Sequence, residues 1–267
     1  MTTKEKLLWA AIVIVLGGVG YAAYHYLTQG KEETQQAAAV QPPPAPPEAE
    51  PAIKNPVPGG GQADAGKPLP ALAASDSGLA EELTQLFGRD SVGAFLVRDN
   101  IIRNVVVTVD NLPRQKVAVE RRPVKPTPGQ TAVDGDADAG EVTTLSVQNY
   151  ARYAPFVKVL AAADAKALAA LYFRWYALFQ QAYEDQGYPD KYFNDRLVAA
   201  IDDMLKAPAV AGPVRLVRPR VFFEFADPAL EARSAGQKLL IRMGPENAAT
   251  IKAKLRELRA EVAGRSG

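Results

Sequence analysis

The segment from Gly187 to Leu197, with the sequence GYPDKYFNDRL, carries the aromatic and polar side chains that best suit ligand recognition. A short aromatic turn leads into the expected start of a helix, where polar groups can meet those of a ligand. The candidate partner surface consists of Tyr188, Tyr192, Asn194, Asp195 and Arg196. The simpler interpretation is a helix–helix connection in which Tyr188 packs across a helix cap at Asp190.

Two other motifs resemble patterns with known chemistry but depart from them. The run from Asp134 to Glu141, DGDADAGE, has Asp at the first, third and fifth positions of a calcium loop. Its glycine falls at the seventh position, and Leu145 stands where the loop needs Glu, so a solvated hairpin turn is the better interpretation. Ser234 and Lys238 are four residues apart, whereas the serine–lysine nucleophile motif needs S-x-x-K.

A glycoside hydrolase needs only two carboxylates, so the composition leaves this class of enzyme open. Nothing in the spacing pairs the available residues. They are Glu184, Asp185, Asp195, Asp202, Asp203 and Glu224. An enzyme acting on a cell-wall polymer therefore stays an alternative, and we assign no catalytic residue.

The amino-acid composition excludes several other kinds of functional site. The chain has no cysteine, which excludes disulfides, thiolate nucleophiles and cysteine-based zinc sites. Its single histidine, His25, lies in an apolar N-terminal segment, so the remainder has no imidazole for acid–base work or metal binding. The formal net charge is +1, and no nucleic-acid partner is expected. We predict no metal and no cofactor.

An apolar run at residues 7–27, LLWAAIVIVLGGVGYAAYHYL, contains no charged residue and is long enough for one helical crossing of a bilayer. Lys4 and Lys6 precede it, while Lys31 is followed at once by two glutamates, so positive-inside counting places residues 1–6 in the cytoplasm. We predict a signal anchor in the inner membrane, with the rest of the chain in the periplasm. A signal peptide cleaved near the alanines at 37–39 is the alternative.

Residues 28–75 are rich in proline, alanine and glycine, and they include the run QPPPAPPEAEPAIKNPVPGGG. Such a composition cannot build a core and favours an extended, partly polyproline tether. We therefore predict a disordered stalk, which would let the following domain approach the cell wall.

Residues 76–263 are predicted to form one soluble domain with a helix-rich α+β fold. Helices are expected from Ser75 to Gly88, over 101–112, after caps at Ser146, Asp164, Asp190 and Asp227, and from Gly244-Pro245 onward. A small β-hairpin is expected from strands near 130–133 and 142–145, and RLVRPRVFFEF is predicted as one further strand.

Two groups of side chains admit both a structural and a binding role. An aromatic stripe at helical spacing is most typical of core, although it could line a groove. Its members are Tyr172, Trp175, Tyr176, Phe179 and Tyr183. Two basic sets could bind an anionic lipid or a wall polymer, or could lie on solvated faces. They are Arg114, Lys116, Arg121, Arg122 and Lys125, and then Arg215, Arg218 and Arg220.

Five segments carry a family resemblance: NVVVTVDNLP, NYARYAPFV, GYPDKYFNDRLV, PVRLVRPRVFFEFADP and SAGQKLLIRMGPENA. Over about residues 70–260 the chain resembles an uncharacterised bacterial family, a domain of unknown function found in single-pass, stalked envelope proteins. The resemblance implies the same membrane topology but brings no activity and no catalytic residues.

These observations predict an inner-membrane-anchored periplasmic interaction or scaffold protein of the bacterial cell envelope, because no catalytic set is complete. Its partners would be the bilayer, through residues 7–27, and an envelope protein or the cell wall. The alternatives are the two-carboxylate enzyme and a lipid or small-ligand binding module, which would need an apolar cavity.

Overall fold

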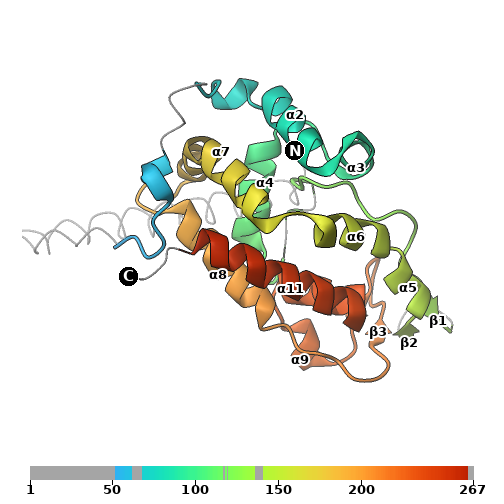
Figure 1. Ribbon diagram of the computed structural model, residues 1–267. Coiled ribbons are helices and arrows are strands. Elements are labelled where there is room, and N and C mark those ends of the chain that lie inside the picture. The colour runs from blue at the N-terminus through green and yellow to red at the C-terminus, as the bar shows by residue number, and fades with distance from the viewer. Residues whose placement is uncertain (1–51, 62–67, 117, 119, 136–140, 264–267) are drawn as a thin grey trace, which may run out of the picture. The chain divides into compact units, whose positions relative to one another are not determined.

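The computed structural model of the protein describes residues 52–61, 68–116, 118, 120–135 and 141–263 (Figure 1). None of the helices in these ranges is both long and apolar enough to cross a bilayer. The predicted anchor at 7–27 lies outside the described residues, as does the first part of the predicted stalk.

The described residues form a helix-rich α+β fold, as predicted. Two short 3-10 helices, η1 (Pro58–Gly61) and η2 (Leu72–Ala74), precede the longer helices. The α-helices are α2 (Asp76–Phe87), α3 (Arg89–Phe95), α4 (Ile101–Asn111), α5 (Val147–Ala151), α6 (Ala154–Ala162), α7 (Ala165–Asp185), α8 (Phe193–Leu205), α9 (Pro228–Glu231), α10 (Ala235–Met243) and α11 (Pro245–Val262).

Helix α7 is the centre of the main core. It packs against α4 on one side and α11 on the other, and α11 also runs along α8 (Figure 1). The predicted aromatic stripe lies in this core, where Trp175, Tyr176, Phe179 and Tyr183 are buried and Tyr172 packs against them. The indole of Trp175 donates to the Glu82 carboxylate at 2.9 Å, so its one polar group is satisfied.

The strands form a four-stranded antiparallel sheet in the order β1 (Val133–Asp134), β2 (Val142–Leu145), β3 (Arg215–Val217) and β4 (Glu224–Phe225). The β1–β2 hairpin confirms the predicted pair. The prediction of one further strand is wrong, because RLVRPRVFFEF folds back on itself as β3 and β4, with Leu216 opposite Phe225. Pro219 cannot donate to a ladder, which favours a turn there.

Helix starts follow the predicted caps at most positions. Asp164 accepts from the Lys166 and Ala167 backbone N–H groups, and Asp227 accepts from that of Ala229. The predicted cap at Asp190 is wrong, since α8 begins at Phe193. The Phe193 N–H is satisfied instead by the Gln180 side chain of α7, at 2.8 Å. A distant residue thus fulfils the role expected of a local cap.

Part of the predicted stalk packs against the domain. Val57 is only 4% exposed and belongs to the core around α7, and η1 contacts that helix. Leu72, also from the predicted stalk, is buried in the same core. Burial of these two side chains offsets the cost of ordering the chain around them. We call residues Ala52–Val57 the strap.

Candidate functional site

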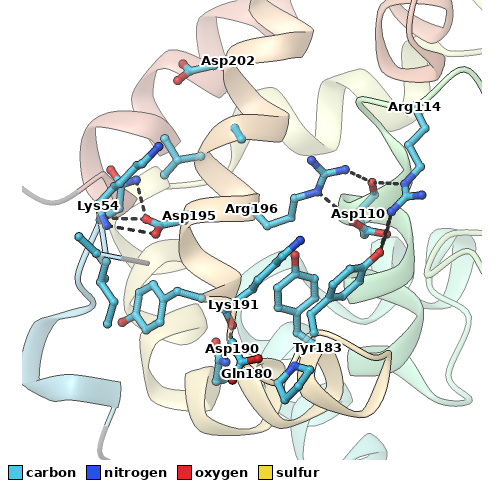
Figure 2. A pocket seen from close by; sticks show the side chains of 18 residues that line it. Lys54, Asp110, Arg114, Gln180, Tyr183, Asp190, Lys191, Asp195, Arg196 and Asp202 are labelled. Carbon is cyan, nitrogen blue, oxygen red and sulfur yellow. Dashed lines mark hydrogen bonds and ion pairs between the residues drawn. The ribbon is translucent and has the colours of Figure 1, made fainter. Parts of the chain in front are cut away.

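The largest cleft of the described residues, about 850 Å³, lies at the N-terminal end of α8. Four stretches of chain line it: the strap, the end of α4 with Arg114, the end of α7 with the α7–α8 turn, and the first turns of α8 (Figure 2). Of the predicted partner surface, Tyr188, Tyr192, Asp195 and Arg196 line this cleft. They lie close together in the chain, in the turn before α8 and in its first turn, which explains why they converge on one opening.

One half of the cleft is organised by Asp110, whose side chain is 8% exposed. Arg114 bonds one carboxylate oxygen at 2.7 Å, and Arg196 bonds the other at 2.9 Å. Arg196 also donates to the Asp110 backbone carbonyl. A buried carboxylate between two guanidinium groups is compensated, and it holds both arginines in place (Figure 2).

The backbone around Arg114 is fixed from another direction. The first N–H groups of α10 donate to it: Gly236 to the Leu112 carbonyl at 2.9 Å and Ala235 to the Arg114 carbonyl at 2.6 Å. These bonds satisfy donors at a helix start that have no partner within the helix. They also fix where the Arg114 side chain leaves the main chain.

Tyrosine rings cover the floor of this half. Tyr188 stacks on the buried Tyr183 with ring centroids 4.7 Å apart, and its hydroxyl accepts from Arg114 at 2.8 Å. The Asp110 carboxylate and this bond to Tyr188 raise the pKa of Arg114 above its ordinary value. Burial, together with the nearby Asp110 charge, raises the pKa of Tyr183. The guanidinium is therefore charged and the phenol neutral throughout the physiological range.

The strap forms the other half, on the opposite side of α8 (Figure 2). Asp195 accepts the backbone N–H groups of Lys54 and Asn55 at 3.1 and 2.7 Å, and the Asn55 side chain at 2.9 Å. Tyr192 accepts the Val57 N–H at 2.9 Å. A side-chain carboxylate at a helix start thus binds a bent, non-helical piece of the chain's own backbone.

Asn194 does not line the cleft, since it is fully buried. Its amide donates to the Asn55 carbonyl at 2.9 Å and to the Val262 carbonyl at 2.8 Å, while Tyr172 donates to its oxygen at 3.1 Å. It therefore ties the strap and the end of α11 to the core, which is a structural role.

Of the candidate carboxylates, Asp195 and Asp202 both line the cleft, and the others lie outside it. Asp202 is paired with Arg259, and Asp203 accepts from Ser234 and Gln237. Ser234 is the N-cap of α10, while Lys238 pairs with Glu231. Residues 136–140 of the proposed calcium loop lie outside the described residues. Within those residues, no group of three or more His, Cys, Asp or Glu side chains could hold a metal.

Sequence reasoning placed no functional role on Asp110 or on the strap. Asp110 follows Val109 at the end of a strongly amphipathic helix, and nothing in the sequence indicates that it is only 5% exposed, because its partners come from elsewhere in the chain. The strap lies in a proline-rich stretch whose composition is typical of a tether. Nothing local distinguishes Asn55 and Val57 from their neighbours.

The geometry defines a class: a small helix-rich α+β domain with a polar cleft whose charged groups are held by the chain itself. Residues 101–259 match a family described as a protein of unknown function, DUF3014, and the chain belongs to that family. The expected membership of a family of unknown function is confirmed. No curated protein and no solved structure matches the chain.

Proposed function

We propose that this protein is an inner-membrane-anchored periplasmic interaction protein of the bacterial envelope and that the cleft at the start of α8 binds its partner. The observation that carries the proposal is the cleft itself. It is large enough for a ligand of several residues, and its aromatic and charged side chains are held in place by buried contacts.

The chemistry of the cleft favours binding over catalysis. Three of its four carboxylates are engaged by the chain: Asp110 by two arginines, Asp195 by the strap and Asp202 by Arg259. The arrangement therefore does not single out two free carboxylates facing one space, which a glycoside hydrolase would need. Groups that orient one another rigidly are suited to recognition.

The apolar run at residues 7–27 supports the anchored arrangement, since it has the length and composition of a bilayer crossing. The strap begins at Ala52, so the tether that we propose extends from 28 to 51. In polyproline form those residues would reach on the order of 70 Å. The cleft would then lie where the tether joins the domain, within that reach of the membrane.

A second candidate, a lipid or small-ligand binding module, has one observation in its favour. An apolar cavity of about 250 Å³ lies among α2, α4, α7, α8 and α11. It is smaller than most ligand pockets. Ligand-dependent melting of the protein would support this candidate, because a ligand that binds only the folded state stabilises it.

Photo-crosslinking tests the interaction proposal directly. A photoreactive residue replaces Pro189, an exposed residue of the cleft, and the control replaces Gln85, an exposed residue of α2. We expect intact cells that make the full chain to yield one discrete adduct from position 189 and none from 85. The same adduct pattern from both positions would contradict a partner site in the cleft.

A further inference from the structure

The arginine half of the cleft points to the chemistry of the ligand. We propose that Arg114 and Arg196, with Lys191, bind a carboxylate of an acidic peptide. This inference rests on the proposed function of the cleft as a partner site and names the kind of group that the partner presents.

The charges in this half do not cancel. Arg114, Arg196 and Lys191 carry three positive charges, while Asp110 and Asp190 carry two negative ones. In the strap half, the charge of Lys54 balances that of Asp195, and Asp202 is paired with Arg259. One positive charge remains, and a monoanion such as a carboxylate matches it.

The two guanidinium groups keep donors available. Arg114 and Arg196 bond Asp110 and Tyr188 through their Nε and Nη2 atoms. Among the described residues, neither Nη1 group has a hydrogen-bond partner. A guanidinium already fixed on one side by a buried carboxylate loses little freedom when it binds a second one, so the site is prepared for an oxyanion.

Lys191 adds a third donor from the same side of α8 (Figure 2). Its ammonium group lies 5.1 Å from the centroid of the Tyr188 ring, and Tyr188 in turn bonds Arg114. The cation–π contact holds the ammonium group beside the two arginines without using a carboxylate. The cationic groups therefore surround one opening floored by tyrosine rings.

The strap supports a peptide as the carrier of the carboxylate. Its backbone N–H groups at Lys54, Asn55 and Val57, and the Asn55 carbonyl, are all bound by side chains at the start of α8. This part of the fold therefore accommodates a non-helical stretch of polypeptide. An extended partner segment lying along the other half would bring an acidic side chain to the arginines, with the strap as the opposite wall.

Binding of two labelled peptides to the purified full chain tests the proposal. The probes are a fluorescent glutamate decapeptide and the matching glutamine decapeptide, followed by fluorescence anisotropy. We expect only the glutamate peptide to bind. Arg114→Gln should weaken its binding about tenfold, since a hydrogen-bonded charge pair is worth roughly 1.5 kcal/mol or more.

Arg103→Gln is the matched control, because Arg103 lies on α4, the helix that precedes Arg114, but forms an exposed ion pair with Asp185 at 2.9 Å. It should leave peptide binding unchanged, and Lys191→Gln should weaken it without touching the buried network. Equal binding of the two peptides, or equal loss in Arg114→Gln and Arg103→Gln, would overturn the proposal. Displacement of the glutamate peptide by inorganic phosphate but not by acetate would assign a phosphate site instead, which also overturns it.

The two proposals fail separately. A crosslinked partner at position 189 combined with no glutamate binding would refute the carboxylate inference and leave the partner site standing. Glutamate binding that depends on Arg114, combined with no crosslinked partner, would support the anion site and count against the envelope partner.

Discussion

Replacing Asp195 by alanine should release the strap while leaving the folded domain intact. The Asp195 carboxylate is the shared acceptor of three hydrogen bonds, from the Lys54 and Asn55 backbone N–H groups and from the Asn55 side chain. Without it, the strap keeps the Val57 contacts and the Asn194 bond but loses its main polar attachment. The substitution therefore affects one segment, the strap, by removing the carboxylate that its three hydrogen bonds share.

The size of the effect follows from those three bonds. Each is exposed or half-buried, so we assign about 1 kcal/mol to each, below the range for buried bonds to charged groups. Once the strap opens, water can hydrogen-bond to Lys54 and Asn55, and these bonds offset part of the lost free energy. A net loss of about 2 kcal/mol in docking free energy corresponds to roughly thirtyfold more opening.

Hydrogen–deuterium exchange of the full chain measures this opening. Amide exchange at Lys54, Asn55 and Val57 should become roughly thirtyfold faster in Asp195→Ala, while exchange at the buried Val106 in α4 stays unchanged. Asp190→Ala is the control, since Asp190 lines the same cleft and forms no hydrogen bond among the described residues. Unchanged exchange at all three strap amides would refute the docked strap.

Three further substitutions test other parts of the structure. Asp110→Asn should lower the free energy of unfolding, measured by urea denaturation, by about 2–3 kcal/mol, because it leaves two guanidinium groups facing a neutral amide. A decrease under about 0.5 kcal/mol would contradict this. Gly244→Ala should lower the melting temperature, since Gly244 has φ 85° and an added Cβ would lie 2.4 Å from the Tyr150 ring; an unchanged midpoint would contradict it. Burial raises the pKa of Glu231, but hydrogen bonds from Lys238 and a backbone N–H outweigh it and hold that pKa below 4.5. A lowered carboxyl pKa stabilises the fold above the unfolded value, so Glu231→Gln should be less stable at pH 7, and the difference should shrink as pH falls below about 4.5; a difference independent of pH would contradict this.

Local sequence signals predicted the helices and their caps well. Asp164, Asp227-Pro228 and Gly244-Pro245 mark helix starts in the structure as they do in the sequence. The reason is physical: a cap satisfies backbone N–H groups within one turn, so its information lies within a few residues. The aromatic stripe of α7 was predictable for the same reason, since helical spacing places its members on one face.

Features that depend on distant partners escaped prediction. Asp190 looked like a cap for α8, but Gln180, on the preceding helix, satisfies the first N–H of α8. The strap is fixed by Asp195, which lies 140 residues from Asn55 in the chain. The candidate surface was predicted in part, because Tyr188, Asp195 and Arg196 follow one another locally. The buried Asp110 that orients Arg196 comes from another helix.

The most direct test of the cleft as the partner site is to block it. Ala199 is an exposed cleft residue on α8, and Ala199→Trp fills the opening with an indole; Ala177, exposed on α7 outside the cleft, provides the matched Ala177→Trp control. The measurement is the yield of the crosslinked partner from position 189 in each background. We predict that the adduct is lost in Ala199→Trp and retained in Ala177→Trp. Equal adduct yields in the two variants would contradict the account.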